Sequence, residues 1–465
     1  MPPETGSLAT MMITKKFIER ESNLKVSFIS LGCPKNTVNS EQMLYLTRQA
    51  GHEIVTNAEE SDAVVINTCA FIESATQEAI DTIIQIGELK KEGKVKYLIV
   101  AGCLAQRYRK EILEELPEVD ALIGISSFGD IADVLDQVAY GHNVEYFKDK
   151  NAPVEEIGRV VSTGSSWAYL RIAEGCNNCC AFCIIPSIRG RYRSRPMDAI
   201  LKEAEDLAAK GYKEIIVIAQ DITRYGEDLY GEKSLATLLK KLVKIDGIEW
   251  IRLHYLYPDA FTDELIDVIA EEPKIVKYLD IPIQHINDTI LKNMHRFGTG
   301  EEIRILFDKL RTRIPNLVLR TSLITGLPGE GEEEFEELCE FLQHAKIQRA
   351  GVFPYSPEDG TPAAKMPRVD SDVARHRADL VMQLQAKIME DFSVSQIGET
   401  LDILCENYDE ESGLCIGRSW ADSPDIDWLV YFDSGKPDLV GQIVPVFIRD
   451  TRDGDLIGTY AGKKK

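Results

Sequence analysis

The sequence predicts an α/β protein with three parts: an amino-terminal domain built on a parallel sheet, a central open barrel of six strand–helix units, and a small antiparallel β-barrel at the carboxyl end. Short apolar strands alternate with helical stretches from residue 25 to residue 353, a pattern typical of parallel sheets. Four of the ten cysteines fall between Cys176 and Cys183, near the start of the second series of units. After Gly398, short and closely spaced strands replace this alternation.

Length and composition set the limits of the prediction. A chain of 465 residues is long enough for three domains of ordinary size, and 44% hydrophobic with 28% charged residues is typical of a globular protein. No apolar run approaches the roughly 18 residues of a membrane span. Residues 1–24 are polar and lack the pattern of a secretory signal, so we expect a flexible extension there and a cytoplasmic protein. In a reducing compartment the cysteines suit metal binding better than a disulfide framework.

The amino-terminal domain is expected over residues 25–140. Its strands are predicted at 26–31, 63–67 and 97–103, and its helices at 40–49, 74–89 and 106–115. Cys33, Cys69 and Cys103 each follow the carboxyl end of one of these strands. Such ends lie along one edge of a parallel sheet, where ligands bind, so the three thiols should converge. Each cysteine could instead be a small buried apolar residue, but the same position in three successive units favours a shared ligand.

The second cysteine group follows an expected linker at 141–164 and a strand at 167–174. Cys176, Cys180 and Cys183 have the spacing C-x3-C-x2-C, and three thiolates can hold three corners of a four-iron cluster. The fourth iron would remain open to the amino and carboxylate groups of S-adenosylmethionine (SAM). A triplet of Cys176, Cys179 and Cys183 is an alternative, since its spacing also occurs in iron–sulfur proteins. A zinc site and a disulfide cluster are further alternatives.

The central domain is expected over residues 165–396. Six strands are too few for a closed eight-unit barrel, so we predict an open one with room for a large substrate. After the first strand, the others are predicted at 214–219, 250–254, 278–283, 318–324 and 351–353, and the helices at 197–210, 235–244, 263–270, 301–312, 332–344 and 373–391.

Polar residues at the carboxyl ends of these strands are candidates for the chemistry. They are Gln220, Asp221, His254, Gln284 and His285, while Arg320 lies inside the fifth strand. Each could equally be a satisfied core group, and the 326–330 turn could be a simple connection. A strip of arginines at positions 189, 191, 193 and 195 could hold a carboxylate or phosphate, or simply neutralise an acidic chain.

The terminal barrel is expected over residues 397–465, with strands at 401–405, 413–416, 428–432, 442–449 and 456–460. Cys405 and Cys415 within it are expected to be packing residues. From Gly398 onward there are 14 acidic and 7 basic residues, and the whole chain carries a net charge of −23. A surface of this kind repels nucleic acid and attracts a basic protein. We therefore expect no extensive nucleic-acid binding.

The cysteine loop resembles that of the radical SAM superfamily, and the run from Glu174 to Pro186 resembles its methylthiotransferase branch. The contexts LGCPKN, NTC and AGC around the three earlier cysteines are similar to the amino-terminal domain of that branch, and the terminal barrel to its TRAM domain. The resemblance implies two 4Fe-4S clusters, one on Cys176, Cys180 and Cys183 and one on Cys33, Cys69 and Cys103. It makes Cys179 a bystander because the aromatic Phe182 precedes Cys183. It also places Phe182, Gln284 and Arg320 near SAM.

Members of this branch modify either transfer RNA bases or an aspartate of ribosomal protein S-twelve. Residues 417–427 resemble the RimO branch, which acts on the protein, although Trp428 stands where a glycine is usual. The resemblance implies that a methylthio group is added to the β-carbon of that aspartate, with an electron donor such as flavodoxin and without an acid–base residue. The alternatives are a transfer RNA methylthiotransferase and a non-catalytic iron–sulfur carrier.

Overall fold

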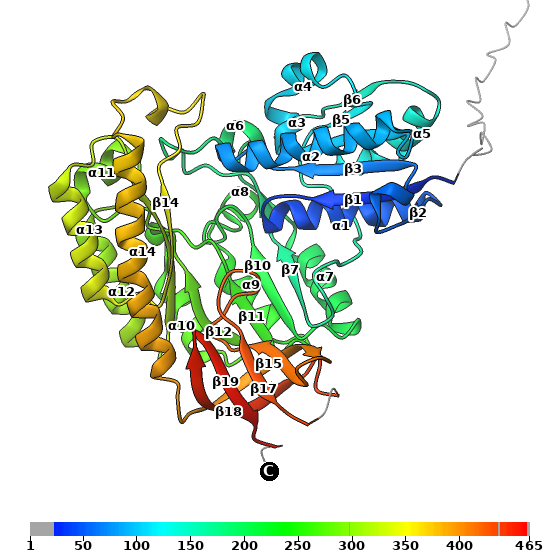
Figure 1. The fold of residues 1–465 in the computed structure, drawn as a ribbon. Helices are drawn as coiled ribbons and strands as arrows, with labels where there is room; N and C mark the ends of the chain where they lie inside the picture. The colour runs from blue at the N-terminus through cyan, green and yellow to red at the C-terminus, as the bar shows by residue number, and fades with distance from the viewer. Residues whose placement is uncertain (1–22, 297, 436–437, 463–465) are drawn as a thin grey trace, which may run out of the picture.

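The computed structural model describes residues 23–296, 298–435 and 438–462, so nearly all of the expected extension at 1–24 lies outside the described residues. The amino-terminal domain and the terminal barrel lie at opposite ends of the central domain (Figure 1). Four short 3-10 helices, η1 to η4, occur at Ala58–Glu60, Phe128–Asp130, Pro258–Ala260 and Ala363–Lys365.

The amino-terminal domain contains six parallel strands in the order β2-β1-β3-β4-β5-β6. Every residue of its central strand β3 is buried, as expected for a parallel sheet with helices on both faces. The strands are β1 (Lys25–Ser30), β2 (Glu53–Ile54), β3 (Ala63–Thr68), β4 (Tyr97–Gly102), β5 (Ala121–Ile123) and β6 (Val144–Tyr146). The helices are α1 (Pro34–Gln49), α2 (Glu73–Lys91), α3 (Cys103–Arg107), α4 (Arg109–Glu115) and α5 (Ile131–Ala139).

Part of this sheet was not predicted. β2, β5, α5 and β6 are absent from the sequence-based interpretation, and β6 lies inside the stretch 141–164 that was expected to be a linker. The cause is local: β6 is a three-residue edge strand, Val-Glu-Tyr, without a buried position. Such a strand has no apolar pattern to reveal it.

The central domain is an open barrel of six parallel strands in chain order, as predicted. β7 (Trp167–Arg171) and β14 (Arg349–Pro354) form the two edges of the described sheet, which is not closed between them. Between these edges lie β10 (Glu214–Ile218), β11 (Trp250–Leu253), β12 (Ile275–Asp280) and β13 (Val318–Thr325). The helices are α7 (Met197–Ala209), α9 (Leu235–Leu242), α10 (Asp263–Glu271), α12 (Gly300–Arg313), α13 (Glu332–Ala345) and α14 (Ser371–Val394).

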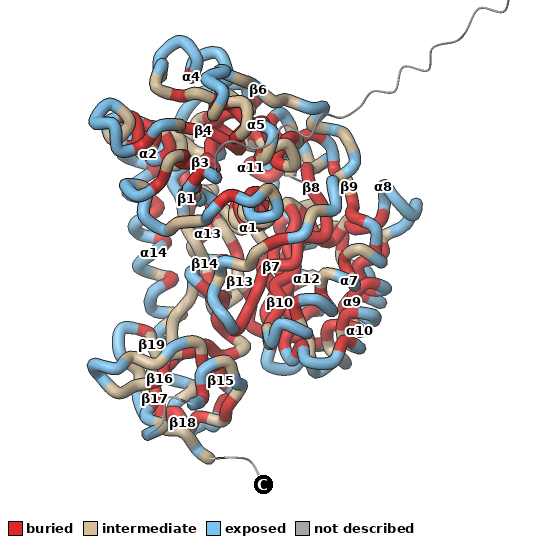
Figure 2. Tube along the Cα trace, turned by 90° about the vertical axis from the view of Figure 1, so that its right-hand side faces the viewer, coloured by how far each residue is buried: buried red, intermediate tan, exposed pale blue. Residues whose placement is uncertain are grey.

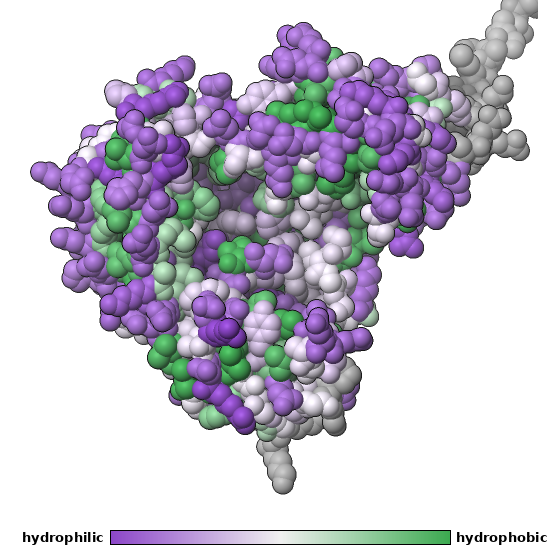
Figure 3. Space-filling view, in the orientation of Figure 1, coloured by the Kyte–Doolittle hydropathy of each residue, from purple (hydrophilic) through white to green (hydrophobic). Residues whose placement is uncertain are grey.

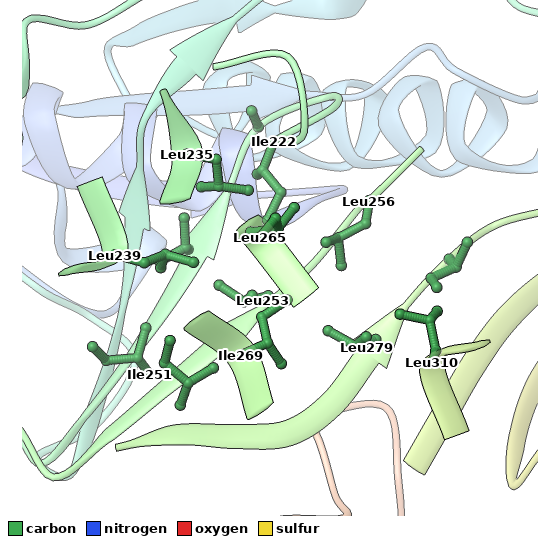
Figure 4. Close-up of a cluster of buried hydrophobic side chains, with 14 of the residues drawn as sticks. Ile222, Leu235, Leu239, Ile251, Leu253, Leu256, Leu265, Ile269, Leu279 and Leu310 are labelled. Carbon is green, nitrogen blue, oxygen red and sulfur yellow. The ribbon is translucent and has the colours of Figure 1, made fainter. Parts of the chain in front are cut away.

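Shorter elements complete this domain: β8 (Ala173–Glu174), β9 (Arg193–Ser194), α6 (Ile185–Arg189), α8 (Glu227–Tyr230) and α11 (Asp288–Asn293). The outward side chains of the strands and the inward side chains of the helices form the largest apolar core. Figure 4 shows part of it, with Leu253 and Leu279 from the strands facing Leu265 and Leu310 from the helices. The buried residues accordingly follow β7 and β10 through the domain (Figure 2). This core fixes the strand ends on which the site is built.

The terminal barrel is closed, with the strand order β15-β16-β17-β19-β18. Its neighbouring strands are antiparallel except for β17 and β19, which run parallel. Cys405 and Cys415 are fully buried in its core, in agreement with their expected packing role. The strands are β15 (Thr400–Asp409), β16 (Leu414–Arg418), β17 (Val430–Asp433), β18 (Ile443–Arg452) and β19 (Asp455–Tyr460).

Residues 418–427, which we call the docking loop, join the terminal barrel to the central strands. Arg418 donates to Glu214 at 2.6 Å, at the first residue of β10. On β11, the carbonyl oxygen of Trp420 accepts from Arg252 at 2.8 Å. The loop also pairs Asp422 with Arg349 at 2.7 Å, at the start of β14. The docking loop therefore attaches the terminal barrel to the first residues of β10 and β14 and to Arg252 within β11.

Candidate active site

The amino-terminal sheet brings Cys33, Cys69 and Cys103 together. They follow β1, β3 and β4, which are neighbours in parallel register. Gly32 allows the first loop to approach the second, because a Cβ atom at this glycine would stand 2.6 Å from the Cβ of Cys69. The φ angle of Gly32 is +89°, a conformation that other residues rarely adopt. The predicted convergence of the three strand ends is therefore present.

Asn36 holds the loops around these cysteines. Its side-chain nitrogen donates to the carbonyl oxygens of Leu31 and Thr68, both at 2.9 Å. Asn67 in turn donates to the backbone oxygen of Asn36 at 2.8 Å. These buried bonds tie the end of β3 to the first turn of α1, and so fix the loop of Cys33 against that of Cys69.

The thiols of this group are free and strongly influenced by their surroundings. Burial and the neighbouring Cys103 and Cys33 raise the pKa of Cys69 to about 12. Burial also raises the pKa of Cys103. Burial acts in the same direction on Cys33, but the charges of Lys35 and Arg189 outweigh it and lower the pKa of this thiol.

The second group lies on the loop that follows β8. Cys180 is buried, and its Sγ accepts a hydrogen bond from Arg296 at 3.5 Å. The backbone N–H of Cys183 donates to the carbonyl oxygen of Cys180 at 3.0 Å, which tightens the turn. Burial raises the pKa of Cys176 to about 11 and that of Cys183 to about 12, and in both cases the thiol of Cys180 adds to the rise.

Cys179 differs from its neighbours in exposure and backbone conformation. It is exposed, and its φ angle is +49°, in the left-handed region. Cys180 is 9% exposed, and the two charged thiols that raise the pKa of Cys183 are Cys180 and Cys176. Cys183 is thus within electrostatic reach of Cys180 and Cys176, and Cys176 is also within reach of Cys179.

Glu174 and Arg189 connect the two cysteine groups. Arg189 donates to both carboxylate oxygens of Glu174, at 3.0 and 3.1 Å, and to the Sγ of Cys103 at 3.4 Å. Arg189 also donates to the side-chain oxygen of Asn36. Burial raises the pKa of Glu174, but Arg189 and Arg171 outweigh it and lower the pKa to about 2. An ionised carboxylate next to Cys176 is therefore linked through one guanidinium to the thiol of Cys103.

The three residues expected near SAM occupy different levels of the barrel. Phe182 packs against the small apolar cluster that includes Ile290 and Leu327. Gln284 has a φ angle of +71°, and its backbone bonds to Ser322 and Ile324 of β13. Arg320 is the third residue of β13 and donates to Asp280 at 2.9 Å. Phe182 and Gln284 thus lie toward the carboxyl ends of the strands, and Arg320 lies deeper.

Most of the other polar candidates have structural partners. Asp221 accepts from Asn178 at 2.8 Å, and Gln220 donates to Glu174 at 2.8 Å. His254 contacts Ser423 of the docking loop at 3.0 Å through Nε2. In the 326–330 turn, Glu330 accepts from the backbone of Gly326 and from Arg377, and lies 3.3 Å from His285.

The arginine strip does not act as one surface. Arg189 is buried between the cysteine groups, while Arg195 pairs with Glu156 and Glu203. Arg193 donates to the backbone oxygens of Arg189 and Arg191, and Arg191 itself is exposed. The neutralising role therefore describes Arg195 and also Arg189, which pairs with Glu174, and no single carboxylate or phosphate site includes all four residues.

Sequence reasoning missed Lys35, Tyr255 and Arg296. The Nζ atom of Lys35 lies 3.4 Å from the centroid of the Tyr255 ring, where the amino-terminal domain faces the barrel. Arg296 lies over the ring of Tyr257 and reaches Cys180. Lys35 stands two residues after a candidate cysteine, which was an available signal, whereas nothing in the local pattern marks Arg296.

The free thiols of each group fit the ligands of an iron–sulfur cluster, and N–H donors at Sγ atoms are typical of the surroundings of such ligands. Among residues 23–296, 298–435 and 438–462, no three His, Cys, Asp or Glu side chains are placed to hold a single metal ion. In a four-iron cluster each thiolate binds a different iron, so its ligands stand farther apart than those of one ion. In the same part of the chain, no helix combines the length and apolar character needed to cross a membrane.

Three family models match the chain in succession. One described as an uncharacterized protein family, UPF0004, matches residues 25–124, the Radical SAM superfamily matches residues 170–342, and the TRAM domain matches residues 397–460. These ranges follow the three parts of the fold.

Full-length relatives are also similar. Ribosomal protein uS12 methylthiotransferase RimO of Lachnoclostridium phytofermentans is 48% identical over 438 residues, covering 94% of this chain and 100% of the relative. The protein of the same name from Geobacter sulfurreducens is 48% identical over 438 residues, covering 93% and 98%. Among solved structures, the radical SAM methyltransferase TsrM of Kitasatospora setae has a TM-score of 0.54 at 13% identity, covering 71% of this chain and 73% of that one. A likeness at this identity concerns the fold alone.

Proposed function

The chain belongs to the RimO family of radical SAM methylthiotransferases, and on this basis we propose that it adds a methylthio group to the β-carbon of an aspartate in ribosomal protein uS12. The observation that carries this proposal is the convergence of two groups of three cysteines on one junction, between the amino-terminal domain and the carboxyl ends of the barrel strands. A single cluster serves many radical reactions. A second thiol group opposite the first provides a place for the sulfur that this reaction inserts.

We assign Cys176, Cys180 and Cys183 to the 4Fe-4S cluster that the radical SAM family implies, and Cys33, Cys69 and Cys103 to a second one. When bound, the first cluster and SAM supply a 5′-deoxyadenosyl radical that removes hydrogen from the target carbon. The residues of the chain bind and orient these groups. Arg296 and Arg189 donate to Sγ atoms of the two groups and so orient these side chains.

For SAM we propose contacts with Phe182, Gln284 and Arg320. Phe182 precedes Cys183 and can pack on the adenine. Gln284 has a left-handed backbone and lies just after β12, where it still pairs with β13. Arg320 forms an ion pair with Asp280, which holds its guanidinium group in place. From this deeper position in the barrel, Arg320 would act on SAM through its positive charge.

The acidic balance of the chain supports a basic protein substrate over RNA. The net charge is −23, and the terminal barrel shares this character with 14 acidic and 7 basic residues from Gly398 onward. Charge of this sign attracts a basic ribosomal protein and repels the phosphates of transfer RNA. We place the reaction in the cytoplasm, with an electron donor such as flavodoxin.

Mass spectrometry of uS12 tests the function. Cells with the active chain should contain uS12 heavier by one methylthio group in place of one hydrogen, and cells with Cys176→Ala should contain the unmodified protein. Cys339→Ala is a matched control because this half-buried cysteine packs against the apolar core of the central domain. Unmodified uS12 in cells with the active chain would refute the proposal. A methylthio group on transfer RNA would instead identify an RNA substrate, and absence of deoxyadenosine release with SAM and reductant would identify a carrier.

A further inference from the structure

The ammonium group of Lys35 has no ion-pair partner among the described residues. The residue is 7% exposed, and its Nζ lies 3.4 Å from the centroid of the Tyr255 ring. Within the described ranges, this nitrogen donates no hydrogen bond and forms no ion pair. Lysine is rarely buried without such a partner, because an ammonium loses its hydration when it leaves water. The ring of Tyr255 offsets only a part of that loss.

The two carboxylates whose charges reach Lys35 are already engaged elsewhere. Glu174 binds Arg189 and Arg171, and Asp280 binds Arg320. The remaining charged neighbours of Lys35 are Cys33 and Arg189. Among the described residues, both carboxylates therefore pair with arginines and neither forms an ion pair with Lys35.

Lys35 lies at the junction of the amino-terminal domain and the barrel, where we expect the substrate to enter. It is the second residue of α1, two residues after Cys33, and it reaches across to Tyr255, which follows β11 at the carboxyl end of the barrel. Tyr255 has a φ angle of +67°, a left-handed conformation that residues other than glycine rarely adopt. The surface is hollowed between the amino-terminal domain and the barrel (Figure 3). Lys35 thus reaches from the amino-terminal domain to the barrel, across the junction where the two cysteine groups lie.

We propose that Lys35 binds the carboxylate of the target aspartate and so selects an acidic side chain for modification. A charge-assisted hydrogen bond from the ammonium would fix the carboxylate and hold the adjacent β-carbon between the two cysteine groups. The inference rests on the proposed function, because it takes uS12 as the substrate. Lys35 anchors the substrate and takes no part in proton transfer.

The test compares two proteins with two substrates. Wild-type enzyme and Lys35→Met are loaded with iron and sulfide, and binding and turnover are measured with uS12 and with uS12 whose target aspartate is replaced by asparagine. Methionine keeps the length and apolar stem of the lysine but removes the charge. Lys94→Met serves as a control on the same domain, because Lys94 is an exposed lysine whose partners are Glu59 and Glu92.

We expect Lys35→Met to weaken binding of the aspartate substrate about 30-fold or more, as is usual when one member of a buried charge pair is truncated. With the asparagine substrate, the binding affinities of wild type and Lys35→Met should agree within about twofold, because this substrate has no carboxylate to pair with Lys35. Lys35→Arg should recover part of the loss, and Lys94→Met should behave as wild type. Iron content should be equal in all four proteins.

Three results would overturn the inference while leaving the proposed function intact. One is equal binding of aspartate uS12 by wild type and Lys35→Met. Another is an equal loss with both substrates, which would mean that Lys35 supports the fold. The third is a loss of iron from Lys35→Met, which would make Lys35 a counter-ion of the Cys33 group. Failure of the wild-type enzyme to modify uS12 would instead refute the proposed function itself.

Discussion

At the scale of single residues, the candidate site depends on charges that compensate one another in a buried place. Glu174, Arg171 and Arg189 are all less than 9% exposed and form one network beside the cysteines. Removing one member of such a network leaves an unpaired buried charge, which costs far more than the pair contributes. The local chemistry is therefore sensitive to single substitutions.

The carboxylate of Glu174 should give the protein a defined acid response. Its pKa of about 2 lies below the ordinary value of 4.5, so its stabilising effect is complete above pH 4.5 and is lost as the pH falls toward 2. At pH 7, Glu174→Gln should lower the free energy of unfolding by about 3–5 kcal/mol, because both arginines lose their partner. Thermal unfolding of the iron-free proteins between pH 7 and pH 3 should show this difference shrinking with acid. A difference that stays constant would contradict the assignment.

The iron content of single cysteine variants separates the members of the loop. Cys180→Ala should lose about half of the iron, since one of two clusters loses a ligand. Cys179→Ala should keep it, because this side chain is exposed whereas that of Cys180 is buried. Iron and sulfide analysis after identical reconstitution measures both. If Cys179→Ala lost iron and Cys180→Ala did not, the ligand triplet would be the alternative that includes Cys179.

At the scale of elements, the sequence predicts the bounds of the strands better than the long-range contacts that the strands make. β10, β11 and β13 end within one residue of their predicted ends because apolar runs bounded by polar residues mark them. β12 was predicted from residue 278 but begins at Ile275, where Lys274 and Lys277 interrupt the apolar pattern. Gln284 lies beyond the strand in both the prediction and the structure, where it pairs with β13.

The cysteine groups were predictable for a similar reason. Chain order and a parallel sheet place strand ends along one edge, so Cys33, Cys69 and Cys103 could be located without coordinates. The bond from Arg418 to Glu214 spans 204 residues, and the bond from Arg189 to Cys103 spans 86. Contacts of this kind depend on how separate domains pack, which no local pattern records.

The docking loop should determine how firmly the terminal barrel is attached. Arg418 is fully buried and bonds to Glu214 and Glu406, so Arg418→Met leaves carboxylates without a full set of partners and should destabilise the attachment by about 3–5 kcal/mol. Limited proteolysis should then cut faster between α14 and β15, at residues 395–399. Arg449→Met is the control, since Arg449 is exposed on β18 of the same barrel. Equal cutting of both variants would show that the loop does not hold the barrel.

At the scale of the whole molecule, charge should control how the substrate arrives. The chain has 76 acidic and 53 basic residues, so a basic ribosomal protein is attracted over distances that salt shortens. The association rate with uS12 should fall at least about tenfold between roughly 50 mM and 500 mM salt. Stopped-flow mixing at several salt concentrations measures it, with dissociation rates recorded in parallel. A rate that does not depend on salt would remove charge as the reason for preferring a protein substrate.

The docking loop also limits which terminal barrels can be exchanged between related chains by recombination. Because its contacts alternate between the terminal barrel and the first residues of β10 and β14, the two domains share one set of ionic partners. A terminal barrel whose docking-loop residues differ would bring its own half of that set and meet counterparts that do not match it. The carboxyl-terminal module is thus not freely exchangeable, and functional chimaeras should need Glu214, Arg252 and Arg349 to travel with it.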